Sequence, residues 1–122
     1  MLDHTAMKRE FDTRAADQVR EMLIDQKDVA EKEMFSGICF MVDEKLCICV
    51  TKENLLCRIG EEKVLTELEK GTCSQMVMNG RTSKNFVYVP IAENLRKQDL
   101  AYWVNLCLEY NPMAKSSKKK SK

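Results

Sequence analysis

The feature that most constrains this fold is a run rich in apolar residues over 34–50, divided by the charged turn at residues 43–45. Both halves of the run are apolar at successive positions, whereas a strand with one solvated face alternates apolar and polar side chains. The sheet is therefore predicted to be covered on both faces. The chain's own helices are expected to cover one face and something else the other, which indicates a binding or assembly module.

The rest of the chain shows the periodicity of helices and antiparallel strands within one domain. The predicted helices cover residues 11–26, 61–70 and 97–110, and the predicted strands cover residues 31–35, 38–42, 46–51, 54–59, 73–78 and 84–89. In the middle helix, Val64, Leu65 and Leu68 are expected to form the buried stripe. This order predicts an α+β fold in two layers, with an antiparallel sheet of about six strands and three helices.

The lengths of two turns assign each side chain to a face of the sheet. A three-residue turn at 43–45 pairs Val42 with Leu46 and hence Cys39 with Cys49. A two-residue turn at 52–53 pairs Val50 with Leu55 and hence Cys49 with Leu56. The face expected beneath the helices carries Ile38, Phe40, Val42, Leu46, Ile48, Val50, Leu55, Cys57 and Ile59. The opposite face carries Cys39, Met41, Cys47, Cys49, Leu56 and Arg58.

This opposite face is the predicted partner-binding surface, since Met and Arg are enriched in interfaces and Lys and Glu are depleted. The expected occupant is a protein partner or a second copy of the chain. The alternative is that the terminal segments, or a helix assigned to the wrong side, cover this face within one molecule. Arg58 is expected either to bind an anionic group or to form a salt bridge with a local glutamate.

Composition is that of a globular domain: 122 residues, 44% hydrophobic and 32% charged. No apolar run approaches the roughly 20 residues of a membrane span, so no membrane association is predicted. The N-terminus lacks the pattern of a signal peptide, which predicts a cytoplasmic location, and the six cysteines are then expected to be reduced thiols. Residues 1–10 are expected to be frayed, residues 11–112 to form the domain, and residues 113–122 to form a disordered lysine-rich tail.

The lysines of the tail conceal an acidic body. The net charge is +1, and five lysines in the last eight residues leave −4 for the rest, because subtracting five from +1 gives −4. An acidic body is a poor match for nucleic acid. The tail is expected to act as a solubilising end. The alternative is weak nucleic-acid binding through Lys115, Lys118, Lys119, Lys120 and Lys122.

No constellation of catalytic residues is apparent in the sequence. The single histidine, His4, lies near the N-terminus, so no Cys-His pair is expected for thiol catalysis. Cys39, Cys47 and Cys49 are expected to share one sheet face, which leaves a soft-metal thiol site as an alternative function. The main prediction is nevertheless a protein that is not an enzyme and that holds no cofactor and no metal.

Several stretches resemble the N-terminal domain of the TfoX/Sxy family, over residues from about 15 to 112. They are Glu-Lys-Glu-Met-Phe-Ser-Gly (31–37), Phe-Met-Val (40–42), Leu-Cys-Ile-Cys-Val (46–50), Asn-Leu-Leu-Cys-Arg-Ile-Gly (54–60), Gly80-Arg81, Phe-Val-Tyr-Val (86–89) and Leu-Ala-Tyr-Trp-Val (100–104). The resemblance implies an α+β domain with a curved antiparallel sheet and, by analogy with the regulation of competence genes, a regulatory role. One departure is Thr-Ser-Lys-Asn at 82–85, where the family usually has Pro-Met-x-Gly.

Overall fold

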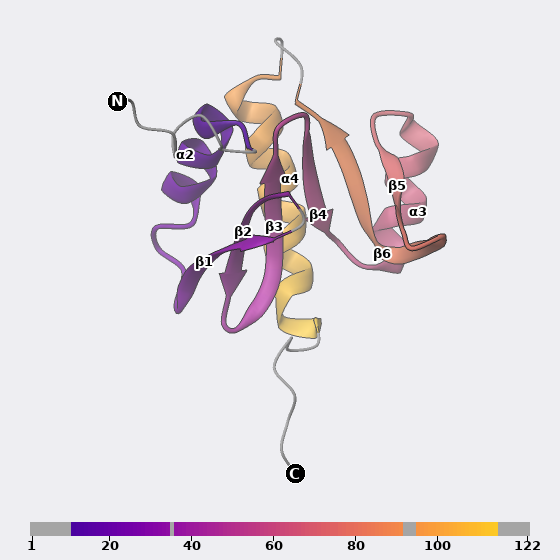
Figure 1. Ribbon diagram of the computed structural model, residues 1–122. Helices are drawn as coiled ribbons and strands as arrows, with labels where there is room; N and C mark the ends of the chain where they lie inside the picture. Colours follow the sequence, from indigo (N-terminus) through magenta and orange to yellow (C-terminus); the bar gives the residue numbers. More distant parts are fainter. Residues whose placement is uncertain (1–10, 35, 92–94, 115–122) are drawn as a thin grey trace.

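The computed structural model describes residues 11–34, 36–91 and 95–114, which form one antiparallel sheet covered by helices (Figure 1). The elements are α2 (Thr13–Met22), β1 (Val29–Met34), β2 (Gly37–Val42), β3 (Lys45–Thr51), β4 (Asn54–Arg58), α3 (Glu61–Lys70), β5 (Ser74–Met78), β6 (Arg81–Pro90), α4 (Lys97–Tyr110) and the 3₁₀-helix η1 (Asn111–Met113). The predicted α+β class and order of elements are confirmed. The prediction of a frayed segment at residues 1–10 lies outside the described residues.

The helices begin and end at recognisable capping residues. Oδ1 of Asp12 accepts a hydrogen bond from the Ala15 amide at 3.0 Å, which satisfies one free donor at the start of α2. Asp99 Oδ2 accepts in the same way from the Arg96 amide, also at 3.0 Å, at the start of α4. α3 ends at Gly71, whose φ of 78° is left-handed. Among the described residues, no helix has the length and apolar composition needed to cross a bilayer.

The strands lie in the order β1-β2-β3-β4-β6-β5, and every neighbouring pair is antiparallel. The predicted pairing of Val50 with Leu55 and of Cys49 with Leu56 is confirmed. Because β6 runs between β4 and β5, the sheet extends from the N-terminal meander directly into the second hairpin.

The hairpin between β2 and β3 differs from the prediction. Asp43 and Glu44 have φ values of 55° and 66°, which is typical of a two-residue turn of type I′. Val42 therefore pairs with Lys45, and a register shift after Phe40 restores the predicted pairing of Cys39 with Cys49. The predicted faces of Leu46 and Cys47 are consequently wrong: Leu46 lies on the side of Cys39, and Cys47 lies beneath the helices.

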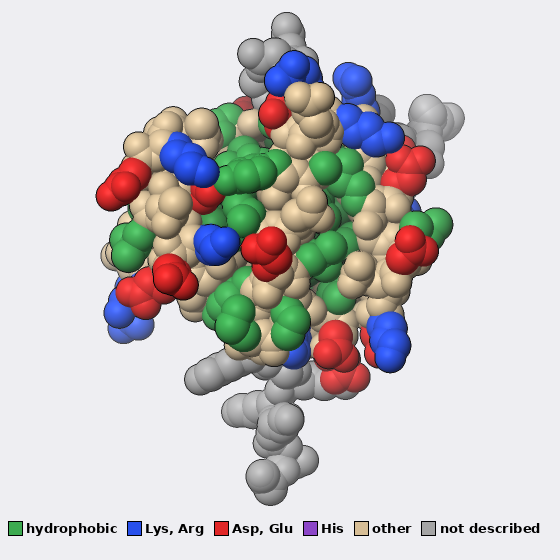
Figure 2. All heavy atoms as spheres, turned by 180° about the vertical axis from the view of Figure 1, so that it is seen from behind, with side chains coloured by type: hydrophobic (Ala, Val, Ile, Leu, Met, Phe, Trp, Pro, Cys, Tyr) green, Lys and Arg blue, Asp and Glu red, His purple; other side chains and the backbone are tan. Residues whose placement is uncertain are grey.

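The main core lies between the sheet and its helices. It joins Val19 of α2, Val64 of α3 and Trp103 of α4 to Phe40 and Ile48 of the sheet. The described helices α2, α3 and α4 therefore cover one and the same face. On the side of the molecule that lies behind the view of Figure 1, hydrophobic side chains reach the surface in several patches, with charged side chains around them (Figure 2).

The buried side of α3 also differs from the prediction. Val64 is buried and Leu68 is half-buried, but Leu65 is 60% exposed, whereas Glu67 is only 2% exposed. Val64, Glu67 and Leu68 are spaced by three and four positions, so they share one side of the helix, and Leu65 lies off it. The predicted burial of Leu65 is wrong, and a carboxylate occupies the side of α3 that faces the protein interior.

Candidate functional site

The predicted partner-binding face of the sheet is buried within the single molecule. Cys39 and Cys49 are 0% exposed, and Met41 and Leu56 are buried with them. They form a second hydrophobic cluster, whose six buried members are Cys39, Met41, Leu46, Cys49, Leu56 and Met76. The expectation that this face needs a cover from outside the chain is therefore wrong.

The cover comes from the sheet itself. Met34 of β1 and Phe86 and Tyr88 of β6 pack against the second cluster, and Met76 of β5 belongs to it. Irregularities in the β2–β3 and β5–β6 ladders accompany this arrangement, and bulges of this kind increase the local twist of a sheet. The outer strands β1, β5 and β6 thus enclose side chains that the flat meander would leave exposed.

Two of the six cysteines are not free thiols. Cys39 and Cys49 lie directly opposite each other on β2 and β3 and are joined as a disulfide. The prediction of six reduced thiols is wrong for this pair, whose side chains meet because paired residues on antiparallel strands point to the same face. The other four cysteines, Cys47, Cys57, Cys73 and Cys107, are free.

Cys39, Cys47 and Cys49 do not share one sheet face, so the predicted group of three thiols does not form. Cys47 lies on the helix side with Cys57 and Cys107, on the opposite face of the sheet from Cys39 and Cys49. A hydrogen bond with Cys107, together with burial, holds the pKa of Cys47 far above its usual range, and burial likewise raises the pKa of Cys107. Within the described ranges, no group of three or more cysteine, histidine or acidic side chains is arranged to hold a metal ion.

Arg58 makes its contacts within the sheet, and its predicted binding of an anionic group stays a prediction. Its Nη1 donates a hydrogen bond to the Leu46 carbonyl oxygen at 3.3 Å, and its guanidinium lies 5.6 Å from the centroid of the Phe86 ring. Nε is buried and has no partner among the described residues, and burial lowers the pKa of the side chain. The predicted salt bridge with a local glutamate is absent from the part of the chain that the structure describes. The five predicted tail lysines lie outside the described residues.

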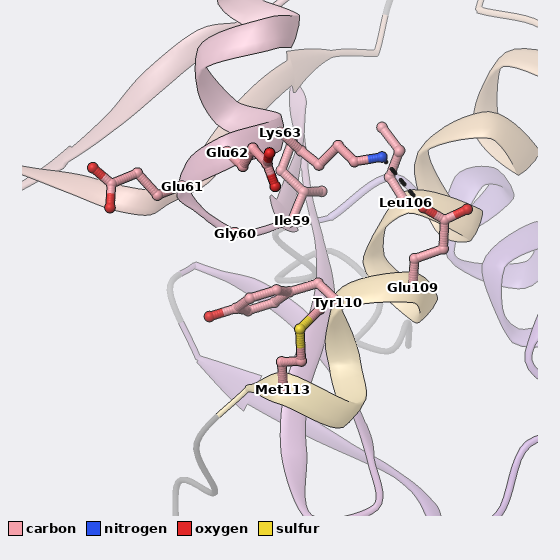
Figure 3. A pocket seen from close by; sticks show the side chains of 9 residues that line it. All are labelled: Ile59, Gly60, Glu61, Glu62, Lys63, Leu106, Glu109, Tyr110 and Met113. Carbon is pink, nitrogen blue, oxygen red and sulfur yellow. Dashed lines mark ion pairs between the residues drawn. The ribbon is translucent and has the colours of Figure 1, made fainter.

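A pocket of about 370 Å³ lies where the start of α3 meets the end of α4 (Figure 3). Its lining consists of Ile59, Gly60, Glu61, Glu62, Lys63, Leu106, Glu109, Tyr110 and Met113. Ile59 and Leu106 are buried and form the apolar floor, while Met113 is 70% exposed at the edge. Figure 3 shows Tyr110 and Met113 on α4 and η1, below the turn that leads into α3. This pocket is hereafter called the α3–α4 groove.

The shape of the groove depends on Gly60. Its φ of +88° is left-handed, and a Cβ at this position would lie 2.6 Å from the Tyr110 ring. A side chain at residue 60 would therefore both strain the backbone and collide with the ring. Because Gly60 has no side chain, Tyr110 packs directly against the start of α3, and its ring forms one wall of the groove.

The rim of the groove is acidic. Glu61, Glu62 and Glu109 contribute three carboxylates, whereas Lys63 contributes one ammonium group. Lys63 Nζ and Glu109 Oε1 are 3.5 Å apart across the groove, and both side chains are exposed (Figure 3). An exposed pair of this kind is weak, so it leaves the excess negative charge available to a ligand.

The sequence contained no direct signal for this groove. Gly60 marks the end of β4, and Glu61 and Glu62 complement the helix dipole of α3, so each residue has a local explanation. Residues 59–63 and 106–113 come together only through the packing of α3 and α4 on the sheet.

The matched family agrees with the fold just described. The model of the TfoX N-terminal domain matches residues 21–110. The chain belongs to the TfoX N-terminal domain family. No curated protein and no solved structure matched the sequence. The family is not a known enzyme family, and membership supports a regulatory or interaction domain in general.

The match of the TfoX N-terminal domain spans most of the residues described above. It includes the sheet from β1 to β6, all of α3 and α4, and every lining residue of the α3–α4 groove except Met113. The lysine-rich tail lies beyond it. The groove is therefore part of the domain proper.

Proposed function

We propose that this TfoX N-terminal domain is a cytoplasmic, non-enzymatic interaction domain with a regulatory role, and that it binds a protein partner through the α3–α4 groove. The observation that carries the proposal is the combination of an apolar floor with an acidic rim at the α3–α4 groove. The second cluster cannot serve in its place, because its side chains are already enclosed by β1, β5 and β6.

The chemistry of the groove selects the partner. Ile59, Leu106 and Met113 offer an apolar surface on which one aliphatic side chain can be buried. The surplus of carboxylates favours lysine or arginine on either side of that anchor. Methionine is unbranched and adapts its shape to what it contacts. The partner we propose is a short protein segment with an apolar residue flanked by basic residues.

The non-enzymatic part of the proposal is supported by the state of the thiols as well as by the family. A thiol nucleophile must be available as thiolate, and the raised pKa of Cys47 and Cys107 opposes ionisation. The cytoplasmic part is compatible with the Cys39–Cys49 disulfide because both cysteines are fully buried, and thiol–disulfide exchange requires access to a sulfur atom.

The test uses the full chain and a synthetic peptide of alternating leucine and lysine, with a peptide of alternating leucine and glutamate as control. We expect saturable binding of the lysine peptide in calorimetry, weakened by salt, with amide NMR shifts around residues 59–63 and 106–113. Replacing Glu62→Gln and Glu109→Gln together should weaken binding about three- to tenfold.

Glu69→Gln is the matched control variant, because Glu69 is exposed on α3 but does not line the groove. It should leave the affinity unchanged. Equal binding of both peptides, or shifts confined to other elements, would contradict the proposal. Self-association that uses the same amides, detected by light scattering, would overturn the choice of a separate partner in favour of a second copy of the chain.

The lysine-rich tail supports a second, weaker proposal. Five lysines in the last eight residues are a local excess of positive charge on an otherwise acidic chain. We propose that this tail contributes weak nucleic-acid binding, which falls steeply with salt and is lost when residues 115–122 are deleted. Binding to a DNA duplex that persists at high salt, or that survives the deletion, would contradict it.

A further inference from the structure

The buried carboxylate of Glu67 marks a second site at the opposite end of α3. Burial of a carboxylate is costly unless its oxygens are hydrogen-bonded, so a helix selected only for stability would place Leu65 inside and Glu67 outside. α3 does the reverse, with Glu67 2% exposed and Leu65 60% exposed. Departures from local patterning of this kind are expected at functional sites.

Among the described residues, only one oxygen of this carboxylate has partners. Glu67 Oε2 accepts hydrogen bonds from the Tyr102 hydroxyl at 2.5 Å and from Lys70 Nζ at 3.1 Å. Lys70 Nζ also donates to the Tyr102 hydroxyl oxygen at 3.0 Å. Glu67 Oε1, which is equally buried, receives no hydrogen bond from any described residue. A buried acceptor in this state favours a ligand that carries a donor.

Glu67 lines a pocket of about 510 Å³ between the C-terminal half of α3 and the N-terminal half of α4. Asp99 adds a second carboxylate to the lining, and Lys70 supplies its one ammonium group. Leu95 and Trp103 give the same pocket an apolar wall. The pocket therefore combines a negative end with a surface suited to an aromatic or aliphatic group.

The position of Lys70 indicates that this site accepts an ammonium group. Its ammonium group lies against Glu67 and Tyr102, at the edge of the Tyr102 ring beside the hydroxyl oxygen. The Lys70 side chain is 53% exposed. Because half of it is in solvent, it can rotate outward and give up its place at the carboxylate to another ammonium group.

We propose that the Glu67 pocket binds a small organic ligand that carries a primary ammonium group on an apolar or aromatic body. The ammonium group takes the place of Lys70 at the Glu67 carboxylate, and Lys70 moves outward in part. The apolar body lies against Trp103 and Leu95. This site is separate from the α3–α4 groove and takes a different class of ligand.

Benzylamine is the probe, and benzyl alcohol is its neutral control of similar shape. Each is titrated into the full chain while amide NMR signals and the fluorescence of Trp103, the only tryptophan, are followed. We expect a saturable response to benzylamine around residues 67–72 and 99–103. Benzyl alcohol should bind about tenfold more weakly or worse, because a charge-assisted hydrogen bond is lost.

Three variants distinguish a change in ligand contacts from a loss of folding. Glu67→Gln keeps the shape of the side chain and should weaken the binding of benzylamine about tenfold or more. Lys70→Met removes the competing ammonium and should tighten binding about three- to tenfold, an effect that unfolding cannot produce. Glu69→Gln, exposed on the same helix, should change nothing.

A lysine side chain presented by a peptide has the same ammonium chemistry as a free amine. N-acetyl-lysine methylamide is therefore titrated in a second experiment. If it binds more weakly than benzylamine, the small aromatic amine is the better ligand. No saturable response in the unmodified chain, equal binding of benzylamine and benzyl alcohol, or no tightening with Lys70→Met would each overturn the proposal. The groove proposal is independent, because its test uses Glu62 and Glu109.

Discussion

On the helix side of the sheet, α2, α3 and α4 cover a cluster that includes Phe40, Ile48 and Leu55. On the other side, the described members of the second cluster all come from strands, among them Cys49 and Leu56. Both clusters are buried, yet one is closed by a layer of helices and the other by the curvature of the sheet. Apolar residues at successive strand positions therefore indicate that both faces are buried, but not which part of the molecule covers them.

The largest expected effect comes from Met41→Glu. Met41 is buried in the second cluster, so a carboxylate there would be desolvated without a partner, at a cost of more than about 4 kcal/mol. We expect the variant to lose its cooperative urea transition. If the second face were an open interface, the same variant would stay folded. Val77→Glu is the control, because Val77 lies on β5 and is 53% exposed, and it should unfold like the parent chain.

Leu55→Ala should destabilise the domain by about 3–5 kcal/mol. Leu55 is fully buried in the main core, where the packed helices and sheet cannot easily collapse into the cavity. The measurement is the free energy of unfolding from urea denaturation followed by circular dichroism. A loss below about 2 kcal/mol would mean that the main core collapses into the cavity more readily than we expect from its cover of packed helices.

Leu56→Ala is the matched test of the other face, since Leu56 is the next residue of β4 and is equally buried. We expect a smaller loss of about 2–3 kcal/mol, because Met76 belongs to this cluster, Met34 packs against it, and flexible methionines fill part of a cavity. The same urea experiment gives the value. A loss equal to or larger than that of Leu55→Ala would show that the two faces are equally rigid.

The disulfide of the second cluster is expected to contribute about 2 kcal/mol, because the bond closes a short loop of sequence separation 10 that the hairpin already holds together. The paired variant Cys39→Ala with Cys49→Ala should show this loss, and Cys73→Ser, a free and half-buried cysteine, should show almost none. Alkylation of the unfolded, unreduced chain should label four thiols. Labelling of all six cysteines would show that the Cys39–Cys49 disulfide is absent.

Much of the fold could be predicted because its signals are local. The pairing of Val50 with Leu55 follows from a two-residue turn between apolar strands, and it is correct. The β2–β3 turn was predicted wrongly because Asp43 and Glu44 adopt positive φ, which non-glycine residues rarely do. Nothing in the residue types distinguished a three-residue turn from a two-residue turn followed by a bulge.

The candidate sites could not be predicted because they arise from contacts between distant segments. Glu67 is buried by Tyr102, 35 residues away in the chain. Gly60 and Tyr110 meet only after α3 and α4 have packed on the sheet. The interpretation of Cys39 and Met41 as an interface failed for the same reason, since part of their cover comes from β5 and β6, which follow much later in the chain.

The smallest expected effect concerns an ion pair that joins a helix of the main core to a strand that packs against the second cluster. Arg20 of α2 donates to Glu31 of β1 through Nε at 2.5 Å and Nη2 at 2.9 Å, and β1 also supplies Met34 to the second cluster. The hydrogen bond from Arg20 lowers the pKa of Glu31. The pair therefore stabilises the fold above the unfolded-state pKa of about 4.3, and this contribution is lost as the pH falls through the lower folded-state pKa.

Glu31→Gln should accordingly cost about 0.5 kcal/mol at pH 7, because both side chains are partly exposed, and almost nothing in acid below the folded-state pKa. Urea unfolding at several pH values measures the difference from the parent chain. Glu33→Gln, exposed on the same strand, is the control and should show no such pH dependence. A loss that stays constant down to acid pH would mean that Glu31 acts through packing, and that β1 is held over the second face by its apolar side chains alone.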